Sequence, residues 1–495
     1  MRASGILLPV FSLPSPYGIG CFSEEAYEFV DFLKRSGQTY WQILPLGPTS
    51  YGDSPYQSFS TFAGNPYYID LWDLVERGWL SEEEVQDCDF GEDVQKVSYG
   101  KLYENRFALL RKAYERSHVA EAPAFGAFVQ EQSYWIHDYA LFMAVKDYLG
   151  GGSWITWPED IRYRWQNALD YYNRELYFDI EYYKFMQYLF YKQWGKLKEY
   201  ANEKGIQIIG DIPIYVAFDS ADVWSHPELF QLKEGSLPAA VAGCPPDGFS
   251  AAGQLWGNPL YRWEYHRETG YDWWVRRVAH CCKLYDLLRI DHFRGFDEYY
   301  SIPAEDDTAV NGHWEKGPGI DLFLTIKERL GEKAIIAEDL GYMTDSVRQL
   351  VKDSGYPGMK VLEFAFDSRD SSSAADYLPH NYTNNCVVYT GTHDNETVMG
   401  WLDSILPEER KLVEAYVGRK RASKAVLCSA LIRSAMSSVA DLCVIPLQDY
   451  LGLGNEARIN HPSTSEGNWQ WRMKKSDLSR KLEKNIAELT STYGR

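Results

Sequence analysis

LLRID at 287–291, KAIIAED at 333–339 and CVVYTGTHD at 386–394 are three short apolar runs that each end at an acidic residue. An apolar run of this length that stops at a carboxylate is typical of a buried parallel strand whose last side chain reaches the rim of a sheet. The runs follow one another at intervals of about 50 residues, which fits alternating strand and helix units. We therefore expect the three acids to meet at one barrel mouth.

Five further apolar runs complete a set of eight candidate strands. They lie at 5–11, 39–47, 205–216, 359–366 and 442–452. A helical pattern opens at SEE (23–25) and closes at Gly37, and another opens at Thr344 and closes at Gly355. Helix-like spacing recurs at 271–288 and 423–439. Eight strands with helices between them predict an α/β fold of the (β/α)8 TIM-barrel type.

A doubly wound open sheet is the structural alternative. That fold usually carries a Gly-rich phosphate-binding turn after its first strand, and here Pro-rich sequence takes this place. The barrel is therefore the favoured fold.

Two gaps between strands are too long for plain connections. Residues 48–204 contain amphipathic helical stretches and predict a mostly helical subdomain inserted after the second strand. Residues 217–286 predict a second insertion, and its Gly-, Pro- and Ala-rich part at 232–263 is expected to be a long ordered loop that acts as a lid. No flexible linker is apparent, so residues 1–495 are expected to form one catalytic domain without a C-terminal β-domain.

The composition limits the classes of partner. The chain has 50 Lys and Arg against 70 Asp and Glu, a net charge of -20, which disfavours nucleic acid and anionic membranes as partners. The eight Cys form no C-x-x-C pair, which indicates reduced thiols rather than disulfides or a zinc site. With neither a signal peptide nor an apolar run of about 20 residues, the chain is expected to be cytoplasmic.

Polar groups end six of the candidate strands. They are Asp211, Asp291, Glu338, Glu363, Asp394 and the pair Gln448–Asp449. Any single one of them is more often a structural carboxylate, but six together at one barrel rim favour a site. Because paired carboxylates break glycosidic bonds, the sequence predicts glycosidic chemistry.

Two of these acids have surroundings that suggest different roles. Arg289 lies two residues before Asp291 and thus on the same face of the strand, where its guanidinium is expected to depress the pKa of Asp291 and favour a nucleophile. Glu338 follows an apolar run and precedes Asp339, so burial and a like charge are expected to raise its pKa, as suits a general acid.

Asp394 stands between His393 and Asn395. Such polar groups hold sugar hydroxyls and stabilise the positive charge of an oxocarbenium-like transition state. His292 and His393 are alternatively metal ligands beside the acids. Since neither HExxH nor H-x-H spacing occurs, no catalytic metal is expected.

Two further segments carry aromatic and polar side chains suited to a sugar polymer. The segment at 51–71 offers Tyr51, Ser54, Tyr56 and Phe59. The expected lid offers Asp247, Phe249, Gln254, Trp256 and Asn258. The alternative is that these aromatic side chains only hold the loops against the barrel.

Several of these segments, in this order, resemble those of glycoside hydrolase family 77, the 4-alpha-glucanotransferases of the α-amylase clan. They are GDSPYQSFSTFAGNPYYIDL, PPDGFSAAGQLWGNPLYRW, LRIDHFRGF, AEDLG, GTHDNET and GLGNEARINHPSTSEGNWQWR. The resemblance covers essentially the whole chain. It departs at Ser463, where Gly is expected, which puts details of the acceptor-side loop in doubt.

The resemblance implies Asp291 as nucleophile, Glu338 as acid/base and Asp394 as stabiliser of the transition state. It further implies a retaining transfer of 4-α-glucan segments from a starch-type donor to glucose or a maltooligosaccharide, without cofactor or metal. The implied sugar contacts are Arg289, His292, His393, Tyr56, Asp247, Trp256 and Asn460. Competing interpretations are a glucan hydrolase or branching enzyme, a noncatalytic glucan-binding protein, and a dehydrogenase or aldolase barrel, for which Lys360 is the only candidate for the lysine that an aldolase needs.

Overall fold

The computed structural model describes residues 2–50, 52–246, 250–341, 343–368, 374–464 and 466–495. Its centre is a sheet of eight strands that pair in parallel, in the order β10-β11-β12-β1-β2-β3-β6-β9. The strands are β1 (Ala3–Leu7), β2 (Tyr40–Gln42), β3 (Gln207–Pro213), β6 (Leu287–Asp291), β9 (Ile335–Ala337), β10 (Gly358–Val361), β11 (Cys386–Tyr389) and β12 (Leu442–Pro446). Six of them fall inside the predicted runs, whereas β1 begins two residues and β10 one residue before its run, and the (β/α)8 fold is confirmed.

The sheet curls until its two end strands, β9 and β10, meet. The backbone nitrogen of Ala337 in β9 donates a hydrogen bond of 2.9 Å to the carbonyl of Pro357, the residue before β10. The barrel interior is filled by one apolar cluster to which most of the strands contribute, as expected of a packed barrel core. It consists of Leu7, Ile209, Ile336, Met359, Val387, Tyr389, Leu442 and Val444.

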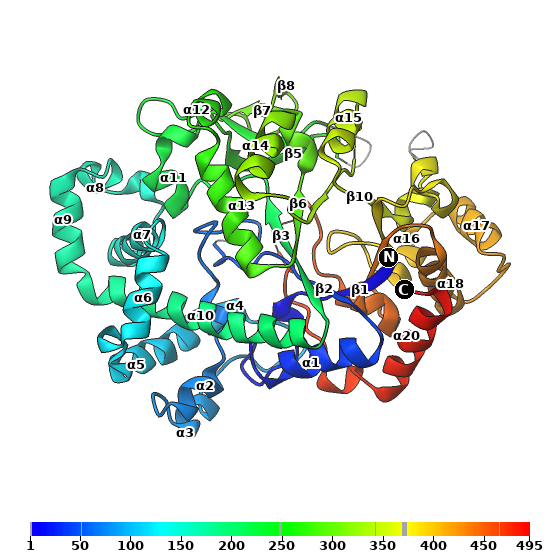
Figure 1. Ribbon diagram of the computed structural model, residues 1–495, viewed down its shortest axis with the longest axis horizontal. Coiled ribbons are helices and arrows are strands. Elements are labelled where there is room, and N and C mark those ends of the chain that lie inside the picture. Colours follow the sequence, from blue (N-terminus) through cyan, green and yellow to red (C-terminus); the bar gives the residue numbers. More distant parts are fainter. Residues whose placement is uncertain (1, 51, 247–249, 342, 369–373, 465) are drawn as a thin grey trace.

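Helices surround the barrel (Figure 1). Those of the shell are α1 (Glu24–Arg35), α13 (Asp272–Leu284), α14 (Ile320–Leu330), α15 (Asp345–Ser354), α16 (Val398–Ser404), α17 (Pro407–Tyr416), α18 (Lys424–Ser437), α19 (Leu447–Leu451) and α20 (Arg480–Tyr493). Thr344 caps α15 by accepting from the nitrogen of Val347, and Gly355 ends it with a φ of 73°. These are the boundaries that the sequence predicted.

The chain between β2 and β3 is rich in helices, which extend to one side of the barrel (Figure 1). They are α2 (Leu71–Glu76), α3 (Glu82–Gln86), α4 (Tyr99–Lys101), α5 (Phe107–Ser117), α6 (Pro123–Glu131), α7 (Ile136–Tyr148), α8 (Glu159–Arg162), α9 (Gln166–Glu175) and α10 (Tyr177–Glu203). The indole nitrogen of Trp194 in α10 donates to the carbonyl of Leu284 in α13. The long helix α10 thereby ties this region to the barrel shell.

The segment 232–263 differs from the irregular loop that we expected. It contains two strands, β4 (Ala240–Cys244) and β5 (Gln254–Pro259), which join β7 (Glu298–Pro303) and β8 (His313–Lys316) in an antiparallel sheet of order β5-β4-β7-β8. A Cβ at Gly243 would lie 2.1 Å from the carbonyl oxygen of Gln254, so the close pairing requires glycine there. The helices α11 (Ala221–Ser225) and α12 (Trp263–Glu268) flank this segment.

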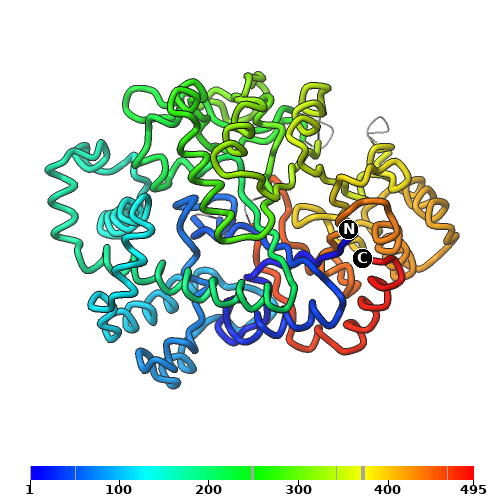
Figure 2. The backbone as a smooth tube through the Cα atoms, in the orientation of Figure 1, coloured from blue at the N-terminus to red at the C-terminus, as the bar shows by residue number. Residues whose placement is uncertain are grey.

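The two ends of the chain lie side by side (Figure 2). Nη1 of Arg495 donates a hydrogen bond of 3.0 Å to the carbonyl of Ala3 in β1. Within the described part of the chain, no helix combines the length and the apolar character that a bilayer crossing needs.

Candidate active site

A groove of about 550 Å³ opens where the barrel strands end. It is lined by segments that follow β2, β3, β6 and β11, by β5, and by residues 460–469. Eight of the predicted site residues line it: Ser54, Tyr56, Gln254, Trp256, Asp291, His292, Asp394 and Asn460. Tyr51 and Asp247, two further predicted residues, and Phe249 of the expected lid lie outside the described residues.

Arg289 is buried beside Asp291. Its side chain is only 3% exposed. Its Nη1 donates to both carboxylate oxygens of Asp211, at 2.8 and 2.7 Å, and its Nη2 donates to Oδ1 of Asp291 at 2.7 Å. One buried guanidinium therefore fixes the end of β6 against the end of β3, and it orients the carboxylate of Asp291.

Glu338 follows β9 and is held by two backbone donors. Its Oε2 accepts from the nitrogen of His292 at 2.7 Å, and its Oε1 accepts from the nitrogen of Leu340 at 2.8 Å. His292 has a left-handed φ of 54°, which turns its N–H toward Glu338 directly after Asp291. The turn thus links the carboxyl groups delivered by β6 and β9.

Burial raises the pKa of Glu338 to about 8, and the nearby charge of Asp291 adds to this shift. The raised pKa agrees with the expectation for a general acid, although the like charge comes from Asp291 and not from Asp339. A carboxyl group with this pKa keeps its proton at neutral pH. It can therefore donate that proton to a leaving group.

The expected depression of the pKa of Asp291 is wrong. Burial raises this pKa, and Arg289 only opposes the shift in part, while the charges of Asp211 and Asp394 raise it further. The spacing in the sequence predicted the guanidinium correctly, but Arg289 is shared with Asp211. The carboxylate of Asp291 therefore lies among like charges in a partly dry site, which leaves it poorly solvated and reactive.

Asp394 is held in the groove by its neighbours. Its Oδ1 accepts from Nδ2 of Asn460 at 2.7 Å, and its Oδ2 lies 3.3 Å from Nε2 of His393. Nη2 of Arg458 donates to the backbone carbonyl of Asp394 at 2.9 Å. Both the carboxylate and its backbone are thus fixed by residues of the segment 458–460.

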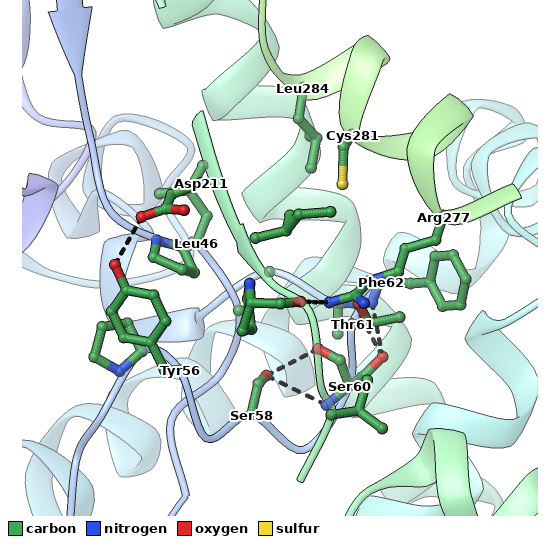
Figure 3. A pocket seen from close by; sticks show the side chains of 18 of the residues that line it. Leu46, Tyr56, Ser58, Ser60, Thr61, Phe62, Asp211, Arg277, Cys281 and Leu284 are labelled. Atoms are coloured by element: carbon green, nitrogen blue, oxygen red, sulfur yellow. Dashed lines mark hydrogen bonds between the residues drawn. The ribbon is translucent and has the colours of Figure 1, made fainter. Parts of the chain in front are cut away.

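Tyr56 connects Asp211, the partner of Arg289, with His393, the neighbour of Asp394. Its hydroxyl donates to Oδ2 of Asp211 at 2.7 Å and lies 2.8 Å from Nε2 of His393, which then serves as the donor to the tyrosine oxygen. The two rings are stacked with centroids 5.3 Å apart. Figure 3 shows Tyr56 reaching Asp211 beside a second cavity. That cavity measures only about 50 Å³, which suits a few water molecules and not a sugar.

Trp256 projects from β5 toward His292. The two rings meet edge to face with centroids 4.8 Å apart, and the indole nitrogen donates to Oε1 of Gln254 at 3.1 Å. Asn258, on the same strand, donates to the carbonyl of Val216 at 2.8 Å and so anchors β5 to the barrel. An aromatic face beside polar groups is the kind of surface that suits a pyranose ring.

The sequence analysis did not single out several residues of the site, among them Tyr215, Arg458 and Trp469. Tyr215 and Trp469 line the groove, and Arg458 fixes the backbone of Asp394. Trp469 has a φ of 61° and packs against both Tyr56 and His393. Trp469 belongs to the NWQW segment at 468–471, but nothing in its local pattern distinguishes it from a core tryptophan.

Within the described ranges, no cluster of three or more His, Cys, Asp or Glu side chains is arranged to hold a metal ion.

Comparisons with known proteins identify the family of the chain. A family model described as 4-alpha-glucanotransferase, that of glycoside hydrolase family 77, matches residues 8–478. A 4-alpha-glucanotransferase of Clostridium butyricum is 50% identical over 489 residues, which cover 98% of this chain and 99% of that protein. A 4-alpha-glucanotransferase of Thermus thermophilus is 48% identical over 97% of this chain and 96% of its own length.

Solved structures give the same result. An amylomaltase from Streptococcus agalactiae, solved in complex with acarbose, is 45% identical and superposes with a TM-score of 0.96 over 100% of both chains. An amylomaltase from Corynebacterium glutamicum is 20% identical with a TM-score of 0.79 over 99% of this chain and 75% of that one, and shows the shared fold.

The barrel and its carboxylate-lined groove define an enzyme that acts on glycosidic bonds. The matches show that the chain belongs to the 4-alpha-glucanotransferases of glycoside hydrolase family 77. Enzymes of this family transfer glucan segments by a retaining mechanism.

Proposed function

We propose that Asp291 is the nucleophile, Glu338 the general acid and base, and Asp394 the stabiliser of the transition state. The observation that carries this assignment is the raised pKa of Glu338, which burial and the adjacent charge of Asp291 produce together. Glu338 thus keeps its proton at neutral pH, while the carboxyl group of Asp291 is bound to the guanidinium of Arg289, and a retaining mechanism needs an acid and a nucleophile side by side. Retention further requires that they lie about 5–5.5 Å apart.

The first half of the reaction breaks the donor glucan. Glu338 gives its proton to the glycosidic oxygen while a carboxylate oxygen of Asp291 attacks C1 from the opposite side. The C1–oxygen bond breaks, the fragment that carries the original reducing end leaves with a free 4-hydroxyl, and a β-linked glucosyl-enzyme remains. The carboxylate of Asp394 stabilises the positive charge on the sugar ring during this step.

The second half passes the glucosyl group to an acceptor. Glu338, now ionised, takes the proton of the acceptor's 4-hydroxyl, the oxygen attacks C1, and Asp291 is released. We propose glucose or a maltooligosaccharide as acceptor and a maltooligosaccharide or starch-type glucan as donor. Transfer exceeds hydrolysis when the acceptor displaces water from the groove, and we assign this task to the strand that carries Gln254 and Trp256.

The remaining groove residues orient the sugar. The face of Trp256 is suited to stacking on a pyranose ring, and Ser54, Tyr56, His292 and Asn460 offer hydrogen-bonding groups along the groove. Arg289 and His393 act from beneath through Asp291 and Asp394. The reducing cytoplasm is the compartment that we propose, which the eight free cysteines support.

Incubation with maltotriose, followed by separation of the products by size, tests the proposal. A transferase converts maltotriose into glucose and a ladder of longer maltooligosaccharides while the number of reducing ends stays constant. A hydrolase increases the number of reducing ends, and that outcome would refute transfer. The variant Asp291→Ala tests the role of the nucleophile. If the protein only binds glucan, its binding should persist in this variant, whereas the activity of a retaining enzyme should be abolished.

A further inference from the structure

Glu363 is a strand-end acid that lies outside the groove. It follows β10, in a short 3-10 turn at Leu362–Phe366, and is only 6% exposed. Among the residues that the structure describes, its Oε1 has no hydrogen-bond partner. A buried carboxyl oxygen without a partner is costly, so its presence calls for an explanation.

The side chain of Glu363 lies against the turn 390–396, which carries Asp394. Its backbone nitrogen donates to the carbonyl of Thr390 at 3.2 Å. A Cβ added to Gly391 would lie 3.1 Å from Oε1 of Glu363, so the carboxyl group touches the backbone of the turn. A side chain at position 391 would require Glu363 to give way by a few tenths of an ångström.

The same turn is anchored from a second side by Asp449. Its Oδ2 accepts from the hydroxyl of Thr390 at 2.6 Å, and its Oδ1 accepts from the nitrogen of Val398 at 2.8 Å. Asp449 therefore binds Thr390 at the start of the turn and Val398 just beyond its end, and Glu363 lies against the start of the turn at Gly391. Because Glu363 and Asp449 are both buried beneath the same backbone segment, the negative charge of one disfavours ionisation of the other.

Of the charged groups around Glu363, Arg458 opposes the rise of its pKa, whereas Asp449 and Glu396 add to it. Asp449 and Glu396 carry the same sign, and both oxygens of Glu396 accept from other residues, Asn455 and Ser404. Arg458 uses its Nε and Nη2 on the carbonyls of Asn460 and Asp394. Burial, with Asp449 and Glu396 in addition, holds the pKa of Glu363 well above its usual range.

We propose that Glu363 is a positioning residue for the reaction: as an uncharged acid it supports the turn 390–396 from beneath and keeps the carboxylate of Asp394 at the transition state. This inference rests on the proposed role of Asp394. The proposed role explains why the carboxyl group of Glu363 lies where a negative charge is unfavourable. In its neutral form the group packs against Gly391 without repelling Asp449. An ionised Glu363 would push the turn away.

Three variants test the proposal with maltotriose as substrate. Glu363→Gln keeps the size and neutrality of the side chain, so kcat should stay within about 3-fold of the parent. Glu363→Ala removes the support, so kcat should fall at least about 10-fold while KM changes less than about 3-fold. Leu110→Ala, in α5 and fully buried, is the matched control: it loses packing but should keep kcat. If Glu363→Ala does not fold, Glu363→Asp takes its place with the same expectation.

The protonation of Glu363 is tested by thermal unfolding of Glu363→Gln against the parent. The unfolded chain releases the Glu363 proton above about pH 4.3, whereas the folded protein keeps it, so the parent loses stability relative to the variant as pH rises. The Tm of the variant minus that of the parent should therefore increase between pH 5 and pH 8. A constant difference would overturn the neutral state.

Asp394→Asn separates failure of the inference from failure of the assigned catalytic role. If Asp394→Asn keeps full activity, the role of Asp394 is wrong. If Asp394→Asn is inactive and Glu363→Ala keeps the kcat of the parent, Asp394 acts without support from Glu363 and the inference is overturned. Loss of kcat in both, with recovery in Glu363→Gln, supports it.

Discussion

The backbone nitrogen of His292 donates a hydrogen bond of 2.7 Å to Oε2 of Glu338. His292 follows Asp291 directly, in a left-handed conformation that costs a non-glycine residue about 1 kcal/mol or more. The strained turn thus couples the carboxyl groups of β6 and β9, so that neither can shift without the other. The separation of the two acids is therefore fixed before a glucan enters the groove.

Replacing Glu338 by Gln, which cannot act as an acid, should separate the role of Glu338 from that of Asp291. With maltotriose, both Glu338→Gln and Asp291→Asn are expected to lose at least about 10³-fold in kcat/KM, roughly 4 kcal/mol of barrier. An α-maltosyl fluoride donor needs no proton for its leaving group. Fluoride release should therefore recover in Glu338→Gln and stay absent in Asp291→Asn. Equal recovery in both variants would contradict the assignment.

The pH dependence of kcat/KM should follow the protonation of the pair. Glu338 must be protonated to act as an acid, and its pKa is about 8, so activity should fall as pH rises through about 8. On the acidic side activity should fall as Asp291 gains a proton. The apparent values belong to the coupled pair.

The contribution of Asp291 to this shift can be measured directly. In Asp291→Asn the neighbouring negative charge is gone, so Glu338 should titrate at a lower pH than in the parent. Infrared or NMR titration of the carboxyl group measures this in the inactive variant. A pKa that stays near 8 would assign the whole shift to burial.

The sequence predicted the barrel and its three acids because each strand is a local, apolar run with a polar end. It did not predict β7 and β8. β7 is stabilised by pairing with β4, more than 50 residues earlier, and β8 by pairing with β7. Nor did it distinguish Glu363 from Asp291. Both end a strand, but the 3-10 turn at Leu362–Phe366 directs Glu363 beneath the rim.

Asp211→Asn should destabilise the protein strongly. Asp211 is fully buried and binds Arg289 through both oxygens, so its loss leaves the guanidinium with only Asp291 as a charged partner. Breaking a buried ion pair from one side costs about 3–5 kcal/mol. Glu483→Gln, in the exposed pair Arg35–Glu483, is the control and should cost less than about 1 kcal/mol. Urea unfolding measures the free energy of unfolding of both variants. Similar losses in the two would show that the buried pair stabilises the fold no more than the exposed pair.

Trp256→Ala should shift the enzyme from transfer toward hydrolysis. Trp256 lines the groove on β5 and packs against His292, so an acceptor sugar stacked on the indole would lose about 0.5–1.5 kcal/mol of binding, which corresponds to an increase in acceptor KM of up to about 10-fold. Because side chains alternate along a strand, Leu255 projects from the opposite face and is exposed, which makes Leu255→Ala the matched control.

The ratio of new reducing ends to redistributed maltooligosaccharides measures the effect of Trp256. Water competes with the acceptor for the same glucosyl-enzyme, so a weaker hold on the acceptor raises this ratio without slowing the first step. Donor cleavage in Trp256→Ala should therefore keep its rate while the ladder of longer products shrinks. If cleavage and ladder fall together, Trp256 binds the donor, and the strand β5 does not select the acceptor over water.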